Sequence, residues 1–148
     1  MRHLLPVLAL LVVPLTACSE DPAEVRADYC AAVKERQKEL TEITSEGGPT
    51  ALIEALGVYR DLRAQAPSDI TDEWQQVIRS IERLDEALDD AGVDPATYDP
   101  KRPPAEVTEE QRRAIEQAAD GVGSEDTQRA LEGVNQHSLD VCKTPLAL

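Results

Sequence analysis

Apolar side chains recur at steps of three and four residues between positions 74 and 91, and this pattern constrains the fold more than any other in the chain. The stripe consists of Trp74, Val77, Ile78, Ile81, Leu84, Leu88 and Ala91. Charged side chains occupy most of the remaining positions, so the segment predicts an amphipathic helix that turns one face to a core. We expect Trp74 to be a core residue rather than a platform for a ligand, because it lies on this stripe.

Proline and glycine divide the rest of the chain into further helical segments. Pro22 and Pro49 occupy the position that proline prefers at the start of a helix, and Pro67 stops the segment that Pro49 begins. No stretch of useful length shows the alternation of a strand. The additional predicted helices cover residues 22–46, 49–66, 109–120 and 124–142. The chain is therefore expected to form an all-α domain over residues 22–142, a bundle of four to five helices.

Polar residues suited to capping stand before the predicted helices. Asp21 precedes the first helix, Thr108 and Gln111 have the spacing of a capping box, and Ser124 precedes the last helix. The cap candidates for the helix of Trp74 are Ser68, Asp69 and Thr71.

Glycine and the chain end supply the stop signals. Gly92 is expected to close the helix of Trp74, because glycine is favoured just after the last helical turn. Gly121 and Gly123 are expected to break the fourth helix. The tail, residues 143–148, is short and expected to fray.

The start of the chain resembles the signal peptide of a bacterial lipoprotein. Arg2 precedes an apolar run over residues 4–15, the length of a secretory signal and shorter than a membrane span of about 20 residues. The residues that resemble a lipobox are Leu15, Thr16, Ala17 and Cys18. In that family the cysteine thiol receives a diacylglyceryl group and the chain is cut just before it. Acylation of the new amino terminus is left open.

A lipobox implies a membrane-anchored protein on the extracytoplasmic face. Residues 1–17 would be the signal peptide, and residues 18–21 would be the lipidated cysteine and a short tether. Two acyl chains such as palmitate suffice for stable anchoring, at about 0.8 kcal/mol per buried methylene. The alternative is a conventional secreted protein in which Cys18 is buried or disulfide-bonded.

The charge of the chain limits its partners. The sequence has 29 acidic and 15 basic side chains, and its formal net charge is −14 at pH 7. Such a chain repels phosphate groups, which excludes nucleic acid as an expected partner. It also gains no attraction to anionic lipid, so the membrane would be held through the acyl group on Cys18.

Cys30 and Cys142 remain once Cys18 is set aside. An even pair in an exported chain favours a disulfide, which here would staple the first helix to the last. The alternatives are a metal pair with His137 and a redox thiol, although the CxxC spacing of either site is absent. We expect the structural bridge.

The connection over residues 93–105 holds four prolines: Pro95, Pro100, Pro103 and Pro104. Their number forbids a regular helix and favours an extended connection. One interpretation is a crossover strap between helix pairs. The other is a recognition site, because connections of this length are often functional; its candidate residues are Tyr98, Lys101 and Arg102.

The sequence as a whole, with its predicted helices, resembles the small all-helical lipoproteins of high-GC Gram-positive bacteria, the actinobacterial type. The features that carry this resemblance are the lipobox, the Tyr29–Cys30 pair in an alanine-rich helix, the turn from Pro67 to Trp74, and the terminal Cys142. The resemblance implies an envelope location and a helical fold. It transfers no active site.

Catalytic and cofactor chemistry finds little support in the sequence. His137 is the one histidine after the signal peptide, so a three-histidine metal site cannot form from one chain. The glycines at 121 and 123 lack the pattern of a phosphate-binding loop. The acidic group Asp85, Asp89, Asp90 and Asp94 lacks the spacing of a calcium loop and is interpreted as solvated. We expect no enzyme, no metal and no cofactor beyond the covalent lipid.

The sequence leaves three candidate functions. The first is a noncatalytic interaction module that presents a helical face or the proline-rich connection to an envelope protein, which predicts a broad exposed apolar patch. The second is a carrier or sensor of a small apolar or cationic ligand between helices, which predicts a pocket. The third is a hydrolase, which requires His137 in a cleft beside a hydroxyl or carboxylate.

Overall fold

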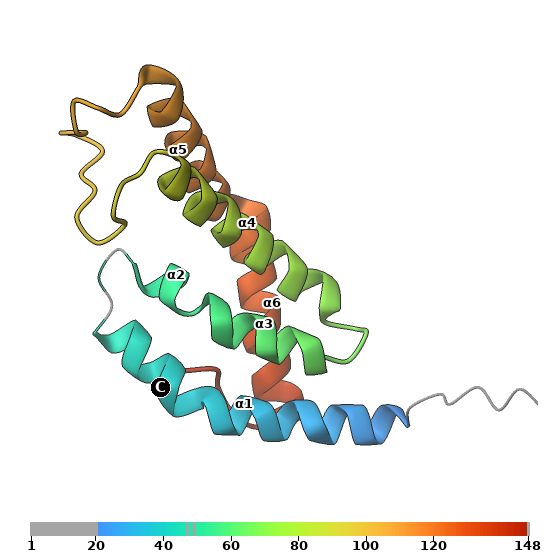
Figure 1. The fold of residues 1–148 in the computed structure, drawn as a ribbon. Helices are drawn as coiled ribbons and strands as arrows, with labels where there is room; N and C mark the ends of the chain where they lie inside the picture. Colours follow the sequence, from blue (N-terminus) through green and yellow to red (C-terminus); the bar gives the residue numbers. More distant parts are fainter. Residues whose placement is uncertain (1–20, 47, 49, 148) are drawn as a thin grey trace, which may run out of the picture.

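The computed structural model describes residues 21–46, 48 and 50–147, and these residues form six helices without a strand (Figure 1). The helices are α1 (Pro22–Ser45), α2 (Ala51–Glu54), α3 (Leu56–Gln65), α4 (Thr71–Asp90), α5 (Glu109–Val122) and α6 (Glu125–Cys142). The prediction of an all-α bundle is confirmed. The lipobox, Leu15 to Cys18, lies outside the described residues.

Helix α4 organises the bundle. Helices α5 and α6 both run antiparallel to it, with α5 along its C-terminal half and α6 along its N-terminal half. Gln111 Nε2 donates to the carbonyl of Asp90 at 2.9 Å, and Gln76 Nε2 donates to Thr127 Oγ1 at 3.1 Å. Helix α3 packs on another side of α4, and α1 packs against α3 and α6, as Figure 1 shows. The stripe of α4 is therefore enclosed over its N-terminal half and covered mainly by α5 beyond it.

The core is built around Trp74. Its side chain is fully buried, and its indole Nε1 donates to the hydroxyl of Tyr29 at 3.1 Å. The ring of Tyr59 lies 5.5 Å from the Trp74 ring in a tilted arrangement. The other fully buried large apolar side chains are Val33, Leu40, Leu62, Val77, Ile81 and Val134. The prediction that Trp74 is a core residue is confirmed.

A disulfide joins Cys30 of α1 to Cys142 at the end of α6. The two Cα atoms are 5.0 Å apart, and 112 positions separate the residues in the sequence. Both cysteines are partly buried and pack against the core cluster. The predicted staple between the first and last helices is confirmed.

The segment predicted as one helix over residues 49–66 is divided at Ala55. Ala55 keeps right-handed backbone angles, and its N–H still donates to the carbonyl of Ala51 at 3.0 Å, so the deviation is local. Ala55 is fully buried, while α2 contacts α1, α3 and α4. A four-residue helix has little cooperativity of its own, so packing sets its direction.

The predicted caps are confirmed for three helices and wrong for α4. Asp21, Thr108 and Ser124 each accept a hydrogen bond from a backbone N–H of the following first turn. The N-cap of α4 is Ile70, without a side-chain cap bond. Ile70 occupies that position because its side chain is buried in the core, while Thr71 Oγ1 donates to the carbonyl of Pro67.

The predicted ends of α4 and α5 have different outcomes. Gly92 closes α4 with φ of +66°, while its N–H donates to the Asp89 carbonyl and that of Val93 donates to the Leu88 carbonyl. These two bonds form a Schellman motif, as predicted for a terminal glycine. Of the two glycines expected to break α5, Gly123 is its C-cap, as predicted. Gly121, by contrast, lies within the helix, because packing against α4 outweighs its low helix propensity.

The tail does not fray over its described residues, 143–147, contrary to expectation. Leu146 is 4% exposed and belongs to the core cluster. Gln37 Nε2 donates to the carbonyl of Pro145 at 2.8 Å, which fixes the tail against α1.

No described helix is long and apolar enough to cross a membrane.

Candidate functional site

The proline-rich loop, residues 93–105, folds back on itself in a series of turns. The N–H of Tyr98 donates to the Asp94 carbonyl at 3.0 Å, and that of Arg102 donates to the Asp99 carbonyl at 3.0 Å. The absence of regular helix is confirmed over these residues, but the expected extended path is wrong. Aspartate side chains stabilise the turns, because Asp94 and Asp99 each accept from the N–H two residues later.

The loop joins two neighbouring antiparallel helices, so its interpretation as a crossover strap between helix pairs is wrong. It leaves the end of α4 and returns to the start of α5, which packs directly on α4. Helices α4 and α5 thus form a helical hairpin. In Figure 1 the loop, drawn in yellow, lies at the end of this hairpin on the side of α2. The hairpin and the loop thereby enclose a groove.

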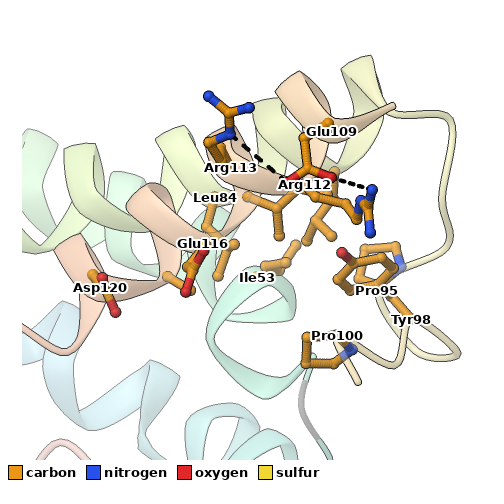
Figure 2. Close-up of a pocket in the computed structure, with 13 residues that line it drawn as sticks. Ile53, Leu84, Pro95, Tyr98, Pro100, Glu109, Arg112, Arg113, Glu116 and Asp120 are labelled. Carbon is orange, nitrogen blue, oxygen red and sulfur yellow. Dashed lines mark hydrogen bonds and ion pairs between the residues drawn. The ribbon is translucent and has the colours of Figure 1, made fainter. Parts of the chain in front are cut away.

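The groove has a volume of about 550 Å³ and an apolar floor. Its floor is formed by Ile53 of α2, Leu84 and Leu88 of α4, and Ile115 and Ala119 of α5. One wall is the loop, which contributes Pro95, Tyr98 and Pro100. In Figure 2, Ile53 lies below α5, and Tyr98 and both prolines are gathered at one end.

Charged side chains of α5 form the rim. Arg112 is hydrogen-bonded to Glu109, and Arg113 Nε lies 3.9 Å from the same carboxylate. Glu116 and Asp120 lie at the other end of the groove in Figure 2, and neither forms an ion pair with a described residue. The rim thus has an end beside the loop where two guanidinium groups contact one carboxylate, and an acidic end that forms no ion pair within the described chain.

Only one of the three predicted recognition residues lines the groove. Tyr98 is half-buried in its wall, whereas Lys101 and Arg102 are exposed and outside it. Arg102 Nε lies 2.9 Å from Asp99 Oδ2, and its side chain is 88% exposed. This hydrogen bond from Arg102, together with the N–H of Lys101, lowers the pKa of Asp99. Arg102 therefore stabilises a turn of the loop.

The rim residues of α5 were missed by sequence reasoning. Their signal is the spacing of Arg112, Glu116 and Asp120, which stand four residues apart and so share one helix face. A second signal is the thin apolar face of this helix, since Ile115 is its one buried residue. A helix that buries so little has most of its surface available for other contacts.

His137 lies in a buried cluster away from the groove. Its side chain is 11% exposed, and Nε2 is 3.8 Å from Asp69 Oδ1. Its ring packs edge-on against Tyr29 with centroids 5.6 Å apart. Ser138 is fully buried on the next position. The hydrolase hypothesis required His137 to lie in a cleft beside a hydroxyl or carboxylate. His137 does lie near the carboxylate of Asp69, but its ring packs against Tyr29 and is mostly buried rather than open in a cleft.

Within the described part of the chain, no group of three or more His, Cys, Asp or Glu residues is arranged to hold a metal ion. The acidic group of α4 includes Asp89 and Asp90, which are exposed.

Comparisons with protein-family models, with curated proteins and with solved structures find no match to this chain. The groove is therefore interpreted from its own residues.

Proposed function

We propose that the protein is a lipid-anchored, noncatalytic binding module of the cell envelope, and that its ligand occupies the groove between α2, α4, α5 and the proline-rich loop. The observation that carries the proposal is the groove itself. Its volume of about 550 Å³ falls in the range of small-molecule sites, and its floor is apolar with polar groups on the rim.

The distribution of apolar surface favours a ligand in the groove over a broad contact with another protein. A docking face was expected to expose a large apolar patch. Among the described residues, Leu139 of α6 is the one exposed large apolar side chain, with 45% of its surface accessible. Ile53 and Leu84 are partly exposed and both line the groove. The groove thus gathers part of the accessible apolar surface in a hollow.

The polar groups of the groove suit recognition. Glu109, Glu116 and Asp120 lie on an exposed helix face open to water. Charged groups stabilise a transition state more strongly in a site from which water is excluded. The rim can select a ligand by charge without transforming it.

The sequence from Leu15 to Cys18 supports anchoring on the extracytoplasmic face of the membrane. The Cys30–Cys142 disulfide agrees with this location, because such bonds persist in oxidising compartments. The groove lies far along the molecule from Asp21, where the short tether ends (Figure 1). The tether would thus leave the groove accessible. Cys18→Ala should leave an unacylated precursor, and mature protein that still partitions with membranes would contradict the lipobox interpretation.

Groove binding is tested by calorimetric titration of the full chain in phosphatidylcholine nanodiscs. The probes are hexyltrimethylammonium, hexanol and hexanoate, which share a six-carbon chain and differ in charge, and empty nanodiscs supply the blank. At least one probe should bind, and Ala119→Phe should remove that binding by filling the floor. Ala114→Phe is the matched control, because Ala114 is exposed on the same helix and lines the opposite side of the hairpin. The proposal fails if no probe binds or if both variants act alike.

A further inference from the structure

We infer that the groove selects an amphipathic cation, a small molecule with an elongated apolar body and one ammonium or guanidinium group. The apolar body would lie on the floor, and the cationic group would lie between Glu116 and Asp120. This inference rests on the proposed function, since it names the class of ligand for the same groove.

The length of the groove sets the shape of the ligand. Its lining residues on α5 extend from Glu109 to Asp120. At a rise of 1.5 Å per residue this distance is about 16 Å along the helix axis. Ile53, Leu84 and Ile115 supply apolar floor along this path. An elongated apolar body therefore fits the groove better than a compact polar one.

The two ends of the rim differ in charge. At the loop end, Arg112 and Arg113 both contact the carboxylate of Glu109. In Figure 2 the guanidinium of Arg113 points away from Ile53, so it is not presented to the floor. At the other end, Glu116 and Asp120 project from the same face of α5 and hold two negative charges.

A cation at the acidic end would relieve a repulsion that the chain leaves in place. Glu116 and Asp120 stand four residues apart, and like charges at this spacing destabilise a helix. Arg83 is a nearby cation, but it lines the hollow on the opposite side of the hairpin and forms no ion pair with either carboxylate. A ligand cation would supply the missing partner.

The charge of the whole chain favours the same sign of ligand. The formal net charge of −14 creates a negative potential around the molecule, which attracts cations and repels anions. Because the carboxylates are exposed, salt should screen the attraction. Cation binding should therefore weaken as ionic strength rises, whereas binding of the neutral probe should change little.

The same titration separates this inference from the proposed function. Hexyltrimethylammonium should bind more tightly than hexanol, and hexanoate should bind most weakly. The double variant Glu116→Gln with Asp120→Asn should reduce affinity for the cation by about three- to tenfold, the range expected from two exposed ion pairs, and leave hexanol binding unchanged. Tetramethylammonium, which lacks the apolar body, should bind weakly to the native chain.

A matched control removes the same charge from the other side of the hairpin. Glu86 and Glu110 line the opposite hollow, so Glu86→Gln with Glu110→Gln should leave the affinity for the cation within twofold of native. Tighter binding of hexanol or hexanoate, with its loss in Ala119→Phe, would overturn the cation inference while the groove remained a binding site. Equal effects of the two double variants would overturn the assignment to Glu116 and Asp120.

Discussion

The indole Nε1 of Trp74 donates a hydrogen bond to the hydroxyl of Tyr29 at 3.1 Å, and both side chains are fully buried. This bond joins α4 to α1 one residue before Cys30, which is bonded to Cys142 of α6. Three helices are therefore fastened within one short segment of α1. The disulfide and this buried hydrogen bond therefore start from adjacent residues of α1.

Loss of the Tyr29 hydroxyl should destabilise the fold. Tyr29→Phe leaves the buried Trp74 N–H without this acceptor, and an unsatisfied buried donor costs about 1–3 kcal/mol. Urea unfolding followed by Trp74 fluorescence measures the change. Tyr59→Phe is the control, since the Tyr59 hydroxyl bonds to no other described residue, and it should cost less. Equal losses in the two variants would contradict a specific role for the Tyr29–Trp74 bond.

The fold should lose stability at alkaline pH. Burial raises the pKa of Tyr29, against the opposing effect of its hydrogen bond with Trp74, and burial also raises the pKa of Tyr59. Since folding favours the neutral phenols, their contribution is complete below the unfolded tyrosine pKa of about 10 and is lost as pH rises through the higher folded values. The measurement is the free energy of unfolding between pH 8 and pH 12.

Two substitutions test the origin of this alkaline loss. Tyr29→Phe and Tyr59→Phe should each make the decline with pH shallower, because each removes one buried phenol. Tyr98→Phe, in the partly exposed wall of the groove, should leave the decline close to native. A shallower decline in Tyr98→Phe alone would show that the buried tyrosines are not responsible.

The disulfide should contribute a large part of the stability. It closes a loop of 112 positions, and removal of a native bridge from a small exported domain typically costs about 2–5 kcal/mol. Cys30→Ala with Cys142→Ala should therefore lower the urea midpoint substantially. Mass analysis of digests should show the Cys30 and Cys142 peptides linked until a reductant is added. Free thiols at both positions in the oxidised protein would refute the bridge.

Two glycine-to-alanine substitutions should have opposite effects. Gly121→Ala should stabilise the fold by about 0.5–1 kcal/mol, because Gly121 is helical and an added Cβ would meet only Arg83 Nη2 at 3.9 Å. Gly92→Ala should cost about 1–2 kcal/mol, because Gly92 has φ of +66°. Thermal unfolding of both variants measures the difference. A destabilised Gly121→Ala would contradict the helical conformation and open surroundings of Gly121.

Local signals account for much of the helical structure. The stripe of Trp74, the caps at Asp21, Thr108 and Ser124, and the stop at Gly92 each act within a few residues, so the sequence predicts them directly. Ile70 shows the limit of this reasoning. Its burial in the core makes it the cap residue of α4, although polar neighbours are better cap formers.

The site was only partly predictable. Tyr98 is found from its place in the proline-rich loop, and the structure places it in the groove wall. Glu116 and Asp120 read as ordinary solvated residues of a helix. The role proposed for them follows from the groove that α2, α4 and the loop form beside α5, which no spacing within α5 reveals.

The sequence by itself determined which segments are helical, that the proline-rich loop is not, and which two cysteines are available for the staple, because these properties depend on neighbours in the chain. Tertiary structure decided the division at Ala55, the burial of Leu146 and the groove. Each of these depends on contacts between elements far apart in the sequence, where packing outweighs local preference.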